Sequence, residues 1–204
     1  MKLVAVSAGL STPSSTRLLA DRLTDAVRDE LADQGHKAEV DVIEMRTLAV
    51  AVANNLVTGF PPPQLATAIE SVTSADGLVT VTPVFAASYS GLFKSLFDLI
   101  DPDALTGKPV LIAATGGTPR HSLVLEHAVR PLFTYLRTVV VPTGVYAASE
   151  DWGSGSDAHT EGLPARIRRA GREMASILAT KATDPQPEDD LTLSKKQLSD
   201  LRFD

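Results

Sequence analysis

Short apolar runs alternate along this chain with longer segments in which apolar residues recur at helical spacing. The runs have the length and β-branching of buried strands, and they are too apolar for a sheet with one wet face. Predicted strands lie at residues 3–6, 40–43, 77–81, 110–114 and 139–141, with 143–146 as a candidate extension of the last. Predicted helices cover residues 18–31, 65–72 and 90–100, a segment from about residue 119, and an arginine-rich segment around 166–172.

This alternation predicts an α/β fold with a parallel sheet covered on both faces. A loop suited to phosphate after the first strand favours the flavodoxin-like, doubly wound arrangement, with five strands in the order 2-1-3-4-5. The alternative is a Rossmann half, but the G-x-G-x-x-G pattern is absent after the first strand, which weighs against a dinucleotide held in the usual way. We expect one domain over residues 1–182 and a polar, acidic tail over 183–204, with a candidate short helix near 195–201. Residues 45–63 show no clear period, which is typical of a binding loop or an oligomer contact.

The composition narrows the class of protein without fixing its activity. The 204 residues are 44% hydrophobic and 22% charged, as in an ordinary globular domain. The net charge of −6 argues against nucleic acid or an anionic membrane as the main partner, and no apolar run approaches the roughly 20 residues of a membrane span. The first strand starts at Lys2, which leaves no room for a signal peptide, and cysteine is absent, so we expect a cytoplasmic protein. The four histidines lack metal-ligand spacing, so no metal site is expected.

The stretch over residues 82–94 carries the first candidate for ligand chemistry. Pro83 cannot donate to a ladder, so we expect the third strand to stop there and a helix to begin near Ser90. The connection offers backbone amides and the aromatic side chains of Phe85 and Tyr89 at the carboxyl edge of the sheet, where open α/β sheets bind ligands. Such a ledge suits a planar heteroaromatic ring; the alternative is that both aromatics pack in the core.

The loops after the first and fourth strands carry the other candidates. Ser14, Ser15 and Thr16 stand where a helix starts, so their hydroxyls and the free backbone amides predict a phosphate site, with ordinary helix capping as the alternative. Residues 115–118 read T-G-G-T, and paired glycines let a backbone approach a ligand closely. His121 follows as a helix-surface residue, a packing residue or a ring contact; no carboxylate stands beside it to support an acid/base role.

Together the three loops resemble the NAD(P)H-dependent FMN reductase family, flavodoxin-like enzymes that supply reduced flavin to two-component monooxygenases. Residues 82–98 read T-P-V-F-x-x-S-Y-S-G-L-x-K-x-L-x-D, which is similar to the family's flavin-ring segment. Residues 114–121 read A-T-G-G-T-x-x-H, with a Pro-Leu pair at 131–132, which is similar to the reductases that partner alkanesulfonate-type monooxygenases. The match covers roughly residues 2–145, and the chain most resembles reductases paired with luciferase-like monooxygenases.

The resemblance implies FMN and NAD(P)H as cofactors and a set of contacts to the flavin. These contacts are, for the phosphate, Ser7, Ser14, Ser15 and Thr16; for the ring, Pro83, Val84, Phe85 and Ser88; for the pyrimidine end, Thr115, Gly116, Gly117 and Thr118; and His121 as a further candidate. Two residues depart from the family pattern. Gly9 stands where the family often has an arginine, which predicts weaker phosphate binding and suits an enzyme that releases its flavin. Phe85 stands where the family more commonly has a tyrosine, and it keeps an aromatic ring on the ledge.

The implied activity is hydride transfer from NAD(P)H to FMN, in which positioning of the two rings leaves no catalytic side chain to name. The family also implies a homodimer or homotetramer. His127 falls where some members widen a helix locally at a subunit interface, with a role in oligomer contact or flavin exchange; the alternative is a surface histidine. The same motifs serve two other functions, an FMN-containing azo or quinone reductase and a non-enzymatic flavodoxin-like electron carrier. NADH and NADPH both remain candidates.

Overall fold

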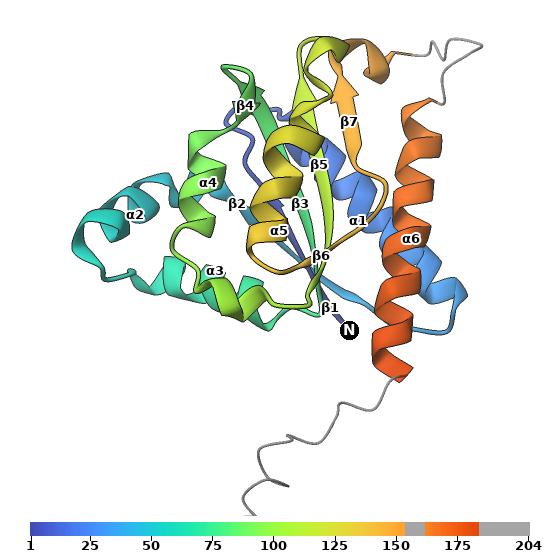
Figure 1. The fold of residues 1–204 in the computed structure, drawn as a ribbon, viewed down its shortest axis with the longest axis horizontal. Coiled ribbons are helices and arrows are strands. Elements are labelled where there is room, and N and C mark those ends of the chain that lie inside the picture. The colour runs from blue at the N-terminus through green and yellow to red at the C-terminus, as the bar shows by residue number, and fades with distance from the viewer. Residues whose placement is uncertain (154–161, 184–204) are drawn as a thin grey trace, which may run out of the picture.

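The computed structural model describes residues 1–153 and 162–183, and its centre is a parallel sheet (Figure 1). Its strands are β1 (Lys2–Ser7), β2 (Glu39–Glu44), β3 (Gly77–Phe85), β4 (Ser88–Tyr89), β5 (Pro109–Gly116), β6 (Val139–Val140) and β7 (Val145–Ala148). The order is β2-β1-β3-β5, and the fifth position is shared by β6 and β7, which pair with successive parts of β5. This confirms the predicted flavodoxin-like order, because β5 is the fourth strand of the prediction. Most of the predicted tail, including its candidate helix near 195–201, lies outside the described residues.

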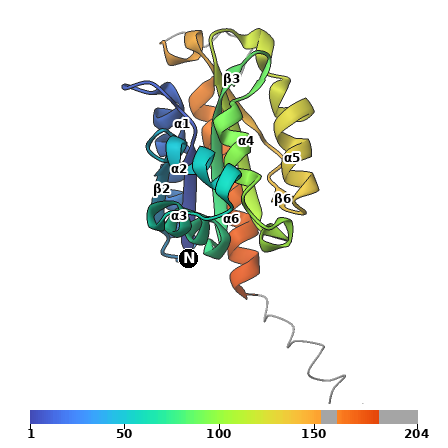
Figure 2. The ribbon, with the colours of Figure 1, turned by 90° about the vertical axis from the view of Figure 1, so that its left-hand side faces the viewer.

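Helices cover both faces of the sheet, to its left and to its right in Figure 1, and Figure 2 looks onto the left-hand face. They are α1 (Ser15–Asp33), α2 (Met45–Thr58), α3 (Pro63–Ser74), α4 (Gly91–Phe97), α5 (Arg130–Tyr135) and α6 (Leu163–Thr183). Helices α1 and α6 pack together on one face, and α2 to α5 cover the other. Along β1, Leu3 and Ala5 point to the first face while Val4 and Val6 point to the second, and all four are buried. Burial on both faces explains the uninterrupted apolar runs of the sequence.

The prediction of an irregular segment at 45–63 was wrong, because most of these residues form helix α2. Leu48 and Val52 are buried on the inner face of α2, which packs against α3 and α4, whereas Val50 and Val57 are 74% and 87% exposed on its outer face. A helix that is apolar on both faces shows no 3.6-residue alternation, which hid its period. A left-handed Gly59 then ends α2 before α3 begins.

The predicted stop of the third strand at Pro83 was also wrong. Strand β3 continues to Phe85, with Pro83 in register opposite Thr115 of β5. It then turns back at Ala86 and Ala87 into β4, which pairs with it antiparallel. The hydrogen-bond ladder between β3 and β5 therefore tolerates the missing N–H of Pro83 near its end. The ledge is a hairpin and not an open loop. The start of α4 at Gly91, capped by the preceding serine, agrees with the prediction.

The helix expected from about residue 119 is broken into three parts. A 3-10 turn spans Pro119–His121, a π-helix spans Leu125–Val129, and α5 begins only at Arg130. The π-helix contains His127, so the locally widened helix implied by the family resemblance is confirmed. The extension proposed at 143–146 is partly right, since β7 begins at Val145 as a separate strand.

Candidate functional site

The loops after β1, β3 and β5 meet at the carboxyl edge of the sheet around a cavity of about 420 Å³. Its volume lies in the usual range for a small-molecule site. The lining residues come from four segments: Leu10, Ser11, Ser15 and Thr16; Pro83, Val84 and Phe85; Thr115, Gly116 and Gly117; and Ser149 and Trp152. Eight of the thirteen predicted site residues are in this set. Ser7, Ser14, Ser88, Thr118 and His121 are not.

The first loop combines helix capping with a free hydroxyl edge. The Ser14 side chain accepts a hydrogen bond from the Arg17 backbone N–H at 3.2 Å, so this serine is the N-cap of α1. A Cβ on Gly9 would lie 2.1 Å from the Ser14 Oγ atom, so any side chain at position 9 would displace the cap. Ser11 and Ser15 are exposed to the cavity beside the unpaired amides of the first turn. That end of the cavity suits an anion.

Two arginines flank this loop, although neither stands in it. Arg17 of α1 pairs with Asp21 at 2.8 Å and with Glu44 at 2.6 Å, and its pKa is raised, first by the hydrogen bond to Asp21. Arg46 of α2 donates to the Thr12 hydroxyl in the loop and lies 3.7 Å from Glu44. Glu44 therefore offsets much of the positive charge that these two side chains bring to the anion end.

A buried hydrogen bond joins the first and third loops. The hydroxyls of Thr16 and Thr115 lie 2.8 Å apart, and the two residues are 3% and 4% exposed. Each hydroxyl satisfies the other, so the floor of the cavity carries no orphaned polar group at this point. The pair joins the first turn of α1 to the end of β5.

The ledge contributes one aromatic face. Phe85 is 47% exposed and borders the cavity, together with Pro83 and Val84. Its hairpin partner is Ser88, and the two turn residues Ala86 and Ala87 have φ angles of 46° and 65°. Positive φ at both central positions is the type I′ pattern that normally selects Asn-Gly, so two alanines there are strained.

Tyr89 does not border this cavity with Phe85. It packs on Phe93 with ring centroids 6.1 Å apart and borders a different cavity of about 620 Å³, between α4 and the helix that contains His127. Tyr89 therefore packs against the core, which is the alternative stated for it in the sequence analysis. The second cavity is larger, but it lies away from the convergent strand ends, so we take the smaller one as the candidate site.

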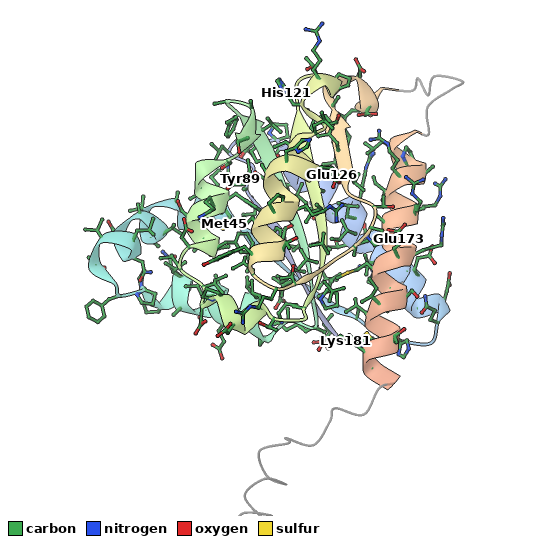
Figure 3. All side chains as sticks on the ribbon, viewed as in Figure 1. Met45, Tyr89, His121, Glu126, Glu173 and Lys181 are labelled. Atoms are coloured by element: carbon green, nitrogen blue, oxygen red, sulfur yellow. The ribbon has the colours of Figure 1, made fainter. Side chains whose placement is uncertain are left out.

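The third loop brings two glycines to the cavity in different surroundings. No atom lies within 4 Å of the position that a Cβ on Gly117 would take, so its backbone faces open space. A Cβ on Gly116 would lie 2.0 Å from the Tyr146 hydroxyl. The Thr118 carbonyl accepts a hydrogen bond from that hydroxyl at 2.7 Å. His121 is exposed at the outer rim, beyond the ends of the strands in Figure 3.

Sequence reasoning missed the fourth wall of the cavity. Ser149 and Trp152 lie on a 3-10 turn directly after β7, and the Arg22 guanidinium stacks on the Trp152 ring at 5.2 Å from its centroid. Asp151 holds the turn by accepting from the Ala148 backbone N–H at 2.7 Å. The available signal was a lone tryptophan just after the last predicted strand.

The residues present fit a flavin mononucleotide. The lining of the cavity combines hydroxyls and amides at a helix start, an aromatic lip, a tryptophan and an open glycine backbone. Within the described ranges, no group of three His, Cys, Asp or Glu side chains could hold a metal ion, and no helix is long and apolar enough to cross a bilayer. The fold is flavodoxin-like, and the cavity at its switch point is a candidate mononucleotide site.

Comparison with known proteins gives the family. The family model described as NADPH-dependent FMN reductase matches residues 1–153, so the chain belongs to the NADPH-dependent FMN reductase family. This confirms the resemblance found in the sequence and, at the level of the family, the prediction of an NAD(P)H:FMN oxidoreductase.

Relatives match over most of their length. The chain is 40% identical over 183 residues to an FMN reductase (NADPH) of Pseudomonas aeruginosa, covering 89% of this chain and 94% of the relative. It is 41% identical over 177 residues to the NADH-dependent FMN reductase SfnE of Pseudomonas putida, covering 87% and 92%. A crystal structure of an oxidoreductase from Corynebacterium diphtheriae superposes with a TM-score of 0.83 at 47% identity, covering 88% of this chain and 97% of that one.

Proposed function

We propose that this protein transfers hydride from NAD(P)H to FMN in the cavity of about 420 Å³ and releases reduced FMN to a luciferase-like, flavin-dependent monooxygenase. The observation that carries the proposal is the convergence of a hydroxyl-lined helix start and an open glycine backbone on one cavity. Bound FMN supplies a ring that accepts the hydride, and NAD(P)H and FMN, with one proton, give NAD(P)⁺ and reduced FMN.

In this proposal, the protein binds and orients both reactants. Ser11 and Ser15, with the first amides of α1, hold the phosphate, and the capping Ser14 keeps those amides in place. Pro83, Val84 and Phe85 form one side of the ring pocket, and the open backbone at Gly117 approaches the pyrimidine end. Ser7, Ser88 and Thr118 then support the three loops from outside the cavity wall. Holding the two rings in contact replaces a bimolecular encounter by an internal step.

Release of the flavin is supported by the charges around the phosphate end. Glu44 pairs with Arg17 and approaches Arg46. Asp21 also pairs with Arg17, so the positive charge of these two arginines is largely offset. Gly9 adds no cation of its own, because the Ser14 cap occupies its side-chain space. Weak electrostatic attraction for a dianion favours FMN as a diffusible substrate over FMN as a prosthetic group.

The kind of monooxygenase that receives the reduced flavin is proposed from two similarities. The relative SfnE carries the name NADH-dependent FMN reductase, and the A-T-G-G-T-x-x-H segment resembles reductases that serve alkanesulfonate-type monooxygenases. The chain resembles those paired with luciferase-like enzymes most. The lack of cysteine supports a cytoplasmic location.

We also propose a homodimer or homotetramer. The outer face of α2 exposes Val50 and Val57, and Phe60 just beyond it is 81% exposed. Exposed apolar groups gathered in one place are typical of an interface. The second cavity, beside the π-helix with His127, is another candidate contact. Light scattering on a sizing column gives the mass in solution directly.

The test is steady-state oxidation of NADH and NADPH with FMN, FAD and riboflavin as acceptors. We expect a colourless protein that oxidises NAD(P)H only when flavin is added, with FMN the best acceptor. A purified protein that is yellow and follows ping-pong kinetics with azo dyes or quinones would favour the azo or quinone reductase. A protein that binds FMN but oxidises neither nucleotide would favour the electron carrier and reject the proposal.

A further inference from the structure

Tyr146 reaches the flavin loop from the neighbouring strand. It lies on β7, in register opposite Ala114 of β5, and it is only 5% exposed. Its hydroxyl donates to the Thr118 carbonyl at 2.7 Å, across 28 residues of sequence. Thr118 is the residue that follows the two glycines, so this bond ties the end of the loop to the sheet.

Gly116 leaves the space through which the phenol passes. A Cβ at this position would lie 2.0 Å from the Tyr146 hydroxyl oxygen and 3.1 Å from the carbon that carries it. A side chain at 116 and the hydroxyl of Tyr146 therefore exclude each other. Gly117 differs, since nothing occupies its side-chain space within 4 Å. The two adjacent glycines have separate tasks: one admits Tyr146, and the other leaves the cavity open.

The rest of Tyr146 is held by a charged network. Arg166 of α6 donates to the Tyr146 backbone carbonyl at 2.6 Å and to Asp151 at 2.6 Å. Asp151 in turn fixes the turn that carries Ser149 and Trp152. Burial, and secondarily the charge of Asp151, raise the pKa of the Tyr146 hydroxyl, so it remains a hydrogen-bond donor at neutral pH.

We propose that Tyr146 is a positioning residue for FMN binding: through the gap at Gly116, its hydroxyl holds Thr118 and so keeps the glycine loop in the shape that receives the flavin. This inference rests on the proposed function. It assigns the hydroxyl to the binding of FMN and not to that of NAD(P)H, because the bond ends on the loop that borders the flavin cavity.

The test is a double-mutant cycle of Tyr146→Phe and Gly116→Ala, read by the FMN dissociation constant. The chain has one tryptophan, Trp152 on the cavity wall, so quenching of its fluorescence reports FMN binding. Tyr146→Phe should weaken FMN binding about tenfold, the usual size of one lost hydrogen bond at a preorganised site. The KM for NAD(P)H and the kcat at saturating FMN should stay within about twofold of wild type. Tyr135→Phe, on an exposed tyrosine that borders the second cavity and not the flavin cavity, is the matched control and should leave the FMN dissociation constant unchanged.

The second variant separates positioning from general damage. Gly116→Ala should weaken FMN binding more than Tyr146→Phe does, because the new methyl displaces the hydroxyl and moves the loop as well. The double variant should bind FMN at least as tightly as Gly116→Ala alone, because removal of the hydroxyl makes room for the methyl. Losses that multiply in the double variant, or a Tyr146→Phe protein that binds FMN as wild type does, would overturn the inference. A wild-type protein that does not bind FMN would instead reject the proposed function.

Discussion

Replacing the two turn alanines of the ledge should stabilise the protein. Ala86 and Ala87 have φ angles of 46° and 65°, in the left-handed region that favours glycine. The left-handed conformation costs an L-residue about 1–2 kcal/mol. The greater flexibility of glycine in the unfolded chain offsets about 0.5–1 kcal/mol of this. The variant with glycine at both positions should therefore gain about 1–2 kcal/mol in the free energy of unfolding.

Thermal unfolding followed by circular dichroism measures this gain. For a chain of this length, 1 kcal/mol corresponds to about 2–4 °C, so the midpoint should rise by roughly 2–8 °C. Ala53→Gly is the matched control: it makes the same substitution at an exposed position of α2, where the backbone is helical, and should lower stability by about 1 kcal/mol. An unchanged or lower midpoint for the turn variant, with the control behaving as expected, would refute the account of strain in this hairpin.

Three further predictions follow from the cavity. Gly117→Val should raise the KM for FMN about tenfold or more, because its side chain would enter the open cavity, whereas His121→Ala should leave that KM within about twofold; equal, negligible effects would reject the assignment of this loop. Thr16→Val and Thr115→Val should each cost about 1–3 kcal/mol in urea unfolding, because each leaves a buried hydroxyl without its partner, and the double variant should cost less than their sum. Strictly additive costs would contradict the shared bond. Glu44→Gln should tighten FMN binding about two- to fivefold at low salt, because it removes the carboxylate beside Arg46 and one of the two beside Arg17, with the gain lost in high salt; weaker binding would show that this carboxylate supports the site instead.

The alternation of short apolar runs with helical segments predicted a parallel sheet, because burial on both faces leaves a period-free apolar strand and few topologies connect five of them. The loop suited to phosphate after the first strand then favoured the flavodoxin-like order. The same reasoning failed at α2, where Val50 and Val57 add apolar residues to the outer face and obscure the helical period. The prediction that the third strand stops at Pro83 failed as well. The cost of a missing N–H depends on where the hydrogen-bond ladder ends, and the residues around Pro83 do not reveal that.

The candidate site was predictable as far as its loops carry recognisable residues. Ser15, Phe85 and Gly117 were found because hydroxyls at a helix start, an aromatic after a strand and paired glycines each have a physical meaning in sequence. Trp152 was missed because its place on the wall depends on how the chain returns after β7. The different tasks of the two glycines were also invisible, since they depend on Tyr146, which lies about thirty residues further along the chain.

The bond between Thr16 and Thr115 spans 99 residues, so its two halves meet only after the strands between them have been assembled. A partly folded intermediate that lacks β5 would have the serine loop but no cavity. FMN should therefore bind the native state alone, and each tenfold excess of FMN over its dissociation constant should add about 1.4 kcal/mol to the free energy of unfolding. Binding of added FMN then becomes a direct measure of how much of the protein has completed its fold.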